Sequence, residues 1–269
     1  VGTNDYFAIE QRIEGQNVTS RFGLGTANAK VLKLSFHVKS SLTGTFGGAI
    51  RGAGFSRTHP FSYTISSADW EKKTITIAAD TGGSYSTNNT TALGVLFSLG
   101  AGSGKSGTAG AWTASDLFSA TGAVSVVGTG SATFEITGVQ LEEVVATDFE
   151  HKKFCEEQLL CQRYYQVIQG NSDLIMFGSG RASGTANALV AVPLSVPLRA
   201  SPTINQVEYT AWGVSASNTE TSTTPAVFAF RSTDTSLHMN FSNLANLTNA
   251  RPAVVSCSSG SDFIMDAEL

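Results

Sequence analysis

Apolar and polar residues alternate along a series of short segments, and this period of two constrains the fold more than any other feature of the chain. Within residues 31–39 (VLKLSFHVK), Leu32, Leu34, Phe36 and Val38 fall on one side and mainly polar residues on the other. Such alternation is typical of a β-strand with one buried face. Repeated half-buried strands indicate a β-sandwich. The same period, bounded by Gly, Ser, Thr or Asn, recurs around residues 61–65, 75–77 and 95–99.

The composition agrees with many short strands joined by tight turns. Apolar residues make up 41% of the 269 residues, charged residues make up only 14%, and 27 residues are glycine. Glycine, serine, threonine and asparagine suit the turns that short strands need. Because a single core stops growing near this chain length, two domains are expected, and one large β-domain is the alternative. The predicted fold class is all-β.

One strand segment, SATFEITGVQLEE, shifts its apolar period by one residue. The apolar positions include Ile136 and then jump to Val139 rather than to Gly138. An extra residue at a glycine is the pattern of a β-bulge. We therefore expect one continuous strand with a bulge at Gly138.

Residues 152–162 (KKFCEEQLLCQ) are the one convincing helix candidate, since they lack Gly and Pro and are rich in good helix formers. Strand-like segments resume after them. The sequence therefore predicts two β-sandwich, jelly-roll-like domains, residues 1–148 and 164–269, joined by a short helical connector at residues 149–163. The strand-like segments of the second domain are RYYQVI, NALVAVPLSV, AVFAFRS, SLHMNFS and DFIMDAEL.

Charge and hydropathy exclude some functions. The net charge of −4 offers no basic stripe for nucleic acid. No apolar run approaches the roughly 20 residues that a membrane-spanning helix needs, so membrane insertion is not expected. The sequence begins with Val rather than Met, which leaves open a missing upstream attachment segment.

Motifs for catalysis, metals and cofactors are not recognisable. The segment GAGSGKSG resembles a phosphate-binding loop, but the position six residues before Lys105 is Leu99 instead of Gly, so we expect a glycine- and serine-rich loop. The four histidines lack metal-ligand spacing, and we expect no cofactor. Paired carboxylates for glycoside cleavage leave no sequence trace in a β-fold. Cys155, Cys161 and Cys257 are expected to be buried free thiols.

Candidate carbohydrate-binding residues are those near predicted loops, because aromatic rings stack on sugar rings while polar groups bind hydroxyls. Structural roles are favoured for Trp70 and Trp112, since Trp is mostly buried. Tyr209 and Trp212 lie where a strand enters a polar loop, and the alternative for them is core packing. Arg57, in the loop RTHPF, is a weaker candidate, and the alternative is that this loop is simply a turn without a binding role. The full set is Tyr209, Trp212, Trp112, Tyr85 and Arg57.

The segment TDFEHKKFCEEQLLCQRYYQ resembles "PFEHRSYGEELxLCQRYY", which is found in many phage tail-fibre and tail-spike-like proteins. Downstream, VAVPLSVPLRASPTI and IMDAEL are similar to later parts of these proteins. Upstream, RIEGQNV, LKLSFHVKSSLTGTF and DWEKKTITIAADT resemble the carbohydrate-binding-module-like jelly roll that often precedes the segment. The resemblance covers most of the chain. His37 stands where the family often has Trp, and Cys155 where it often has Gly.

The resemblance implies a virion protein of the tail fibre or a tail appendage, made in the host cytoplasm. It implies a homotrimer that contacts other phage tail proteins and binds a host surface glycan during attachment, without enzymatic activity. A structural virion connector or collar protein is one alternative, and a polysaccharide-cleaving tail spike is another. Arg163, Tyr164 and Tyr165 are expected to be packing and hydrogen-bond anchors.

Overall fold

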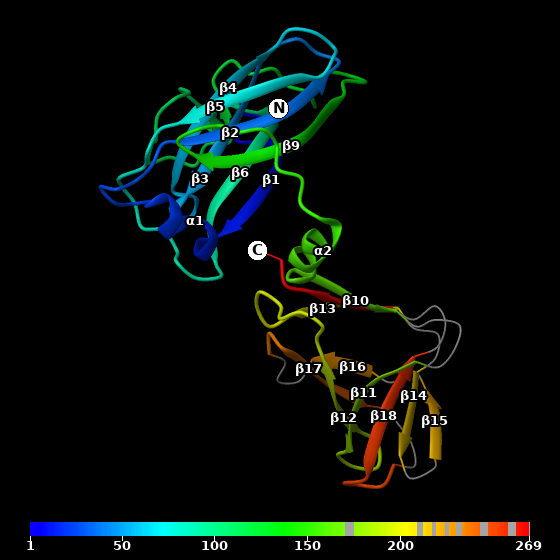
Figure 1. Cartoon of the computed structure of the whole chain (residues 1–269). Coiled ribbons are helices and arrows are strands. Elements are labelled where there is room, and N and C mark those ends of the chain that lie inside the picture. The colour runs from blue at the N-terminus through cyan, green and yellow to red at the C-terminus, as the bar shows by residue number, and fades with distance from the viewer. Residues whose placement is uncertain are drawn as a thin grey trace. The chain divides into compact units, whose positions relative to one another are not determined.

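The protein, seen as a computed structural model, is all-β with two short α-helices among its described residues (Figure 1), which confirms the predicted fold class. Residues 1–151 and residues 152–268 form two compact units, and each is described by itself. The structure describes every residue except 170–174, 209–211, 217–218, 224–225, 230–232, 243–246, 258–261 and 269; side chains are also not described for residues 53, 168–177, 203–232 and 255–263.

Two antiparallel sheets dominate the first unit. The first sheet has the strand order β1-β6-β3-β4, and the second sheet has the order β5-β2-β9. The strands are β1 (Tyr6–Glu14), β2 (Leu32–Ser40), β3 (Gly44–Gly52), β4 (Arg57–Ile65), β5 (Glu71–Ile77), β6 (Thr91–Ala101) and β9 (Phe134–Glu143), with a short parallel pair β7 (Ser106–Gly107) and β8 (Ser119–Ala120).

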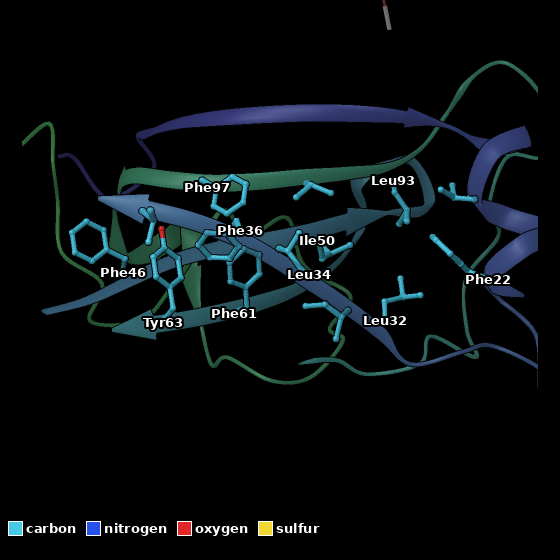
Figure 2. Close-up of a cluster of buried hydrophobic side chains, with 14 of the residues drawn as sticks. Phe22, Leu32, Leu34, Phe36, Phe46, Ile50, Phe61, Tyr63, Leu93 and Phe97 are labelled. Carbon is cyan, nitrogen blue, oxygen red and sulfur yellow. The ribbon is translucent and has the colours of Figure 1, made fainter. Parts of the chain in front are cut away.

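Both sheets contribute side chains to one apolar core, so they pack face to face (Figure 2). The four alternating apolar residues of β2 are each at most 1% exposed, as their period predicts. Phe36 is central, because its ring meets Tyr63 and Phe97 edge to face at centroid distances of 5.0 and 4.9 Å. Edge-to-face pairs add to the stability that burial alone provides. The first sheet contributes Phe46, Ile50, Phe61, Tyr63, Ile65, Leu93, Val95 and Phe97.

The predicted bulge in β9 is present. Ser35 of β2 lies opposite Gln140, and His37 lies opposite Thr137, so one extra residue is accommodated in β9 between these pairs. Gly138 has a φ of 59°, the left-handed conformation that glycine adopts without strain. The strand continues beyond the bulge to Glu143, as expected.

Helix α1 (Gly15–Phe22) was not predicted, because its sequence GQNVTSRF contains mostly poor helix formers. Tertiary contacts stabilise it instead. Val18 and Phe22 are buried in the core, and the Thr19 hydroxyl donates a hydrogen bond to the Ser86 carbonyl. Packing therefore overrides local propensity here.

The segment after β6 covers the outer face of the first sheet. Phe118, Ser119 and Ala120 are all at most 3% exposed. A Cβ atom on Gly47 of β3 would lie only 2.8 Å from the Ala120 nitrogen, so glycine allows this close approach. Earlier in the same segment, residues 103–105 form a 3-10 turn in place of the helix that a phosphate-binding loop requires.

The second unit begins with helix α2 (Phe154–Gln162) and contains a three-stranded sheet, β10-β19-β13, and a seven-stranded sheet, β15-β14-β18-β11-β12-β17-β16. Its described core includes Leu237, Met239, Phe241 and Met265, each 0% exposed. The strands are β10 (Tyr165–Gln169), β11 (Ile175–Ala182), β12 (Ala188–Pro193), β13 (Thr203–Glu208), β14 (Trp212–Ala216), β15 (Thr219–Thr223), β16 (Ala226–Ala229), β17 (Ser236–Ser242), β18 (Pro252–Cys257) and β19 (Asp262–Asp266).

The segment CQRYYQ is held in the second unit by hydrogen bonds of its backbone and of the Gln166 side chain. The carbonyls of Arg163 and Tyr164 accept hydrogen bonds from the backbone N–H groups of Arg199 and Ala267, both at 2.8 Å. The Gln166 amide donates to the Val196 carbonyl at 2.6 Å. The Tyr165 side chain, expected to pack, is instead 44% exposed.

The cysteines differ in part from expectation. Cys155 and Cys161 are free thiols, as predicted, but both are exposed on α2 rather than buried. The helix contains no buried residue, so its thiols also remain accessible. The side chain of Cys257 lies outside the described residues.

We predict that Gly138→Ala lowers the free energy of unfolding by about 1–2 kcal/mol, because alanine resists the left-handed conformation. Chemical denaturation of the full chain measures this change. Gly130→Ala is the matched control, since Gly130 has open space around its Cα, and its stability should change by less than about 0.5 kcal/mol. Equal effects of the two substitutions would contradict the role of the bulge.

Candidate functional site

Three of the five predicted carbohydrate-binding residues lie at one end of the first unit. Arg57 and Tyr85 both contact Asp80, and Trp112 donates a hydrogen bond to the carbonyl of Ala78, two residues away from Asp80. Of the other two, Tyr209 lies outside the described residues. Trp212 is the first residue of β14, and its side chain is not described.

A buried carboxylate organises this end of the unit. Asp80 is 2% exposed and accepts two hydrogen bonds from the Arg57 guanidinium, the one from Nε at 2.8 Å. It also accepts one from the Tyr85 hydroxyl. Burial alone would raise the pKa of Asp80, but the hydrogen bonds from Arg57 and Tyr85 outweigh it and hold that pKa below its usual value.

The Tyr85 ring itself is enclosed. It is 9% exposed, and a Cβ atom on Gly52 would lie 2.5 Å from the ring. Burial raises the pKa of the Tyr85 hydroxyl, and its hydrogen bond to Asp80 adds to that rise. Its ring therefore offers little surface for stacking on a sugar, and its visible role is to hold Asp80.

Trp112 and His59 hold the backbone of Ala78, just after β5, at the same end of the unit. The Trp112 indole donates to the Ala78 carbonyl at 2.7 Å, and His59 Nε2 accepts a hydrogen bond from the Ala78 N–H at 3.3 Å. The two rings meet edge to face at 5.5 Å. His59 is 1% exposed, and burial lowers the pKa of its imidazole. Trp70, for which a structural role was favoured, is 47% exposed.

A second cluster, which the sequence did not reveal, lies on the outer face of the first sheet. Arg51 of β3 is buried, with its guanidinium 4.2 Å from the Phe118 ring centroid and 4.3 Å from that of Phe55. Tyr6 stacks on Phe118 at a centroid distance of 3.6 Å, and Arg12 lies over Phe55 at 5.3 Å. We call Tyr6, Phe118, Arg51, Phe55 and Arg12 the aromatic–arginine column.

The turn between β3 and β4 places Phe55 in the column. Both Gly54 and Phe55 have left-handed φ angles, 67° and 65°. This conformation is unfavourable for phenylalanine. The cation–π contact with Arg51 offsets part of that cost, because such contacts are worth more when desolvated.

Carboxylates neutralise the buried arginine. Arg51 donates to Glu10 at 3.1 Å and to Asp116 at 2.6 Å, and Lys105 donates to Asp116 at 2.8 Å. Burial alone would raise the pKa of Asp116, but the hydrogen bonds from Lys105 and Arg51 bring it below its usual value. Asp116 is therefore ionised at neutral pH, and it remains 45% exposed.

Sequence patterns gave only an indirect signal of this cluster. Ile50 faces the core, so Arg51 and Ala49 must face the opposite side of β3. The small residues Gly47 and Ala49, which share that outer face with Arg51, were a sign that another segment covers it. Nothing local showed that the segment is the one containing Phe118.

Other site types find no support in the described part of the chain. No group of His, Cys, Asp or Glu side chains there is arranged to hold a metal ion. None of the helices there is long and apolar enough to cross a membrane.

Comparison with known proteins gives no assignment. No family model, curated protein or solved structure matches the chain.

We predict that Asp80→Asn lowers the free energy of unfolding at pH 7 by about 2 kcal/mol, because Arg57 loses its charged partner. The folded-state pKa of Asp80 is depressed, so the carboxylate's contribution is complete above the unfolded pKa of about 4. It is lost as the pH falls through the lower folded-state pKa. The stability difference between wild type and variant should therefore shrink below about pH 4.

Urea denaturation at several pH values measures this difference. Asp69→Asn is the matched control, because Asp69 is an exposed carboxylate in a turn. A gap between wild type and Asp80→Asn that stays constant from pH 7 to about pH 3 would show that the ionised carboxylate is not the source of the stability.

Proposed function

We propose that the chain is a component of a phage tail fibre or tail appendage that attaches to host surface polysaccharide without cleaving it. The virion part of the proposal rests on the segment TDFEHKKFCEEQLLCQRYYQ and its resemblance to tail-fibre proteins. The binding part rests on the aromatic–arginine column, which ends in the half-exposed ring of Tyr6. An exposed aromatic ring held by a rigid support is a common way of binding sugars.

The charges in the column favour binding over cleavage. Glu10 and Asp116 share one guanidinium, so they form a pair of neighbouring carboxylates like the pair that a glycosidase requires. A glycosidase, however, needs one carboxyl with a raised pKa to act as general acid. The pKa of Asp116 is lowered instead, by Lys105 and Arg51. Asp116 is therefore suited to accept hydrogen bonds rather than to donate a proton.

An exposed apolar surface supports self-association, and we propose a homotrimer. Of the 16 large apolar side chains exposed among the described residues, five lie on α2 or in the strand that follows it in the second unit. Concentrated apolar exposure of this kind marks an interaction surface. The five are Phe154, Leu159, Leu160, Tyr165 and Val167.

Both positive and negative side chains lie at the start of α2, so two copies of the chain can form ion pairs with each other there. Lys152 and Lys153 precede the helix, while Glu156 and Glu157 lie in its first turn. Neighbouring copies can therefore match opposite charges at the edges of the apolar surface. Contact with a different virion protein would cover the same surface, and this keeps a structural connector or collar role as the second candidate.

Attachment is tested with the full chain and host cells. We expect the purified protein to bind host cells or their isolated surface polysaccharide and to reduce phage adsorption by competition. Incubation with the polysaccharide should release no new reducing ends. If the protein neither binds nor competes, the adhesin proposal is wrong and the connector role is favoured. Release of reducing ends would favour the polysaccharide-cleaving tail spike.

Self-association is tested by substitutions on α2. We expect the wild-type chain to have the mass of a trimer in light scattering, and Leu159→Gln combined with Leu160→Gln to reduce it to a monomer, because polar groups disfavour the buried contact. Val127→Gln is the control, since Val127 is as exposed as Leu160, at 47%, but lies in the first unit. A bismaleimide should link copies through Cys155 or Cys161. A monomeric wild type would overturn the proposal.

A further inference from the structure

We propose that the outward face of Tyr6, whose other face stacks on Phe118, is a subsite for a neutral pyranose residue. This inference rests on the proposed glycan-binding function and assigns it to particular side chains. Tyr6 was not among the residues that sequence patterns suggested.

One face of the Tyr6 ring is covered and the other is open. The ring lies nearly parallel to Phe118, with an interplanar angle of 21° and a centroid distance of 3.6 Å. Phe118 is 3% exposed, whereas Tyr6 is 48% exposed. The exposed area of the Tyr6 ring therefore belongs largely to the face turned away from Phe118, and an apolar sugar face can stack there.

Several contacts fix the position of the ring before any ligand arrives. The backbone of Tyr6 pairs with Ala101 at the start of β1. The residues just before Tyr6 pack against the glycine-rich turn, where the N–H of Gly102 donates to the Asp5 carbonyl at 2.9 Å and that of Gly104 to the Thr3 carbonyl at 2.8 Å.

A side chain on either glycine would collide with this N-terminal segment. The glycines of GAGSGKSG thus allow the placement of Tyr6. A preformed platform binds with a smaller loss of conformational entropy than a mobile one.

Polar groups lie next to Phe118, the ring on which Tyr6 stacks. The Lys105 ammonium is 5.3 Å from the Phe118 centroid, and the Lys105 carbonyl accepts a hydrogen bond from the Phe118 N–H at 2.8 Å. Asp116 is held by Lys105 and stays partly exposed. An ammonium donates hydrogen bonds and a carboxylate accepts them, so this pair offers both a donor and an acceptor for sugar hydroxyls.

Charge balance favours a neutral sugar. Arg51 and Lys105 contact Glu10 and Asp116 through the ion pairs already described, and Arg12 at the other end of the column contacts Glu10 at 3.7 Å. Each of these three cations therefore has a carboxylate partner that competes with a sugar carboxylate. Binding should therefore change little between low and high salt, unlike binding that depends on unpaired charge.

The test uses the full chain on an array of immobilised glucan, mannan and galactan oligosaccharides, with polygalacturonate as the acidic probe. We expect wild type to bind a neutral member, and Tyr6→Ala to weaken that binding about tenfold while Tyr6→Trp retains it. Phe7→Ala is the matched control, because Phe7 is a neighbouring aromatic residue with 50% exposure and should bind normally. Thermal unfolding confirms that each variant is folded.

The outcomes separate the two proposals. If wild type binds and Tyr6→Ala binds equally well, or if Trp70→Ala is the substitution that abolishes binding, the Tyr6 subsite is wrong while glycan binding stands. Binding to polygalacturonate alone, or strong loss of binding at high salt, also overturns the neutral-sugar assignment. If wild type binds neither the array nor host polysaccharide, the proposed function itself fails.

Discussion

The packing of Phe36 and its aromatic neighbours between the two sheets is the interaction on which the first unit depends. It fixes which face of each strand points inward. On β3, Ile50 enters this core and Arg51 is consequently forced to the outer face. A register shift of one residue would reverse both side chains. The position of the candidate site is therefore a consequence of the core.

Arg51 shows how an outer face can become buried without becoming apolar. A buried guanidinium is costly unless it is paired. Here Glu10 and Asp116 neutralise it, and Phe55 and Phe118 enclose it. The covering segment is thus held by charge as well as by packing, and the same contacts that stabilise it also support the ring of Tyr6. Structure and candidate function share these residues.

The fold was more predictable than the site because a strand's period is local, whereas a site is assembled from distant segments. Alternation identified β2 and the bulge at Gly138, and helix propensity identified α2. Helix α1 was missed, since contacts such as Thr19 with Ser86 come from residues far apart in the sequence. Arg57 and Tyr85 were each candidates, but their shared contact with Asp80 was not predicted. A sequence also cannot distinguish an aromatic ring enclosed by Gly52 from one that faces solvent.

A single platform such as Tyr6 explains only weak attachment. Aromatic stacking contributes about 0.5–1.5 kcal/mol beyond the area it buries, whereas even a millimolar dissociation constant requires about 4 kcal/mol. Several linked copies overcome this limit, because after one site binds the others experience a high effective concentration of ligand. In the proposed homotrimer, the apolar surface around α2 would bring the chains together, and the Tyr6 platforms of the linked copies would together convert a shallow sugar contact into firm adhesion.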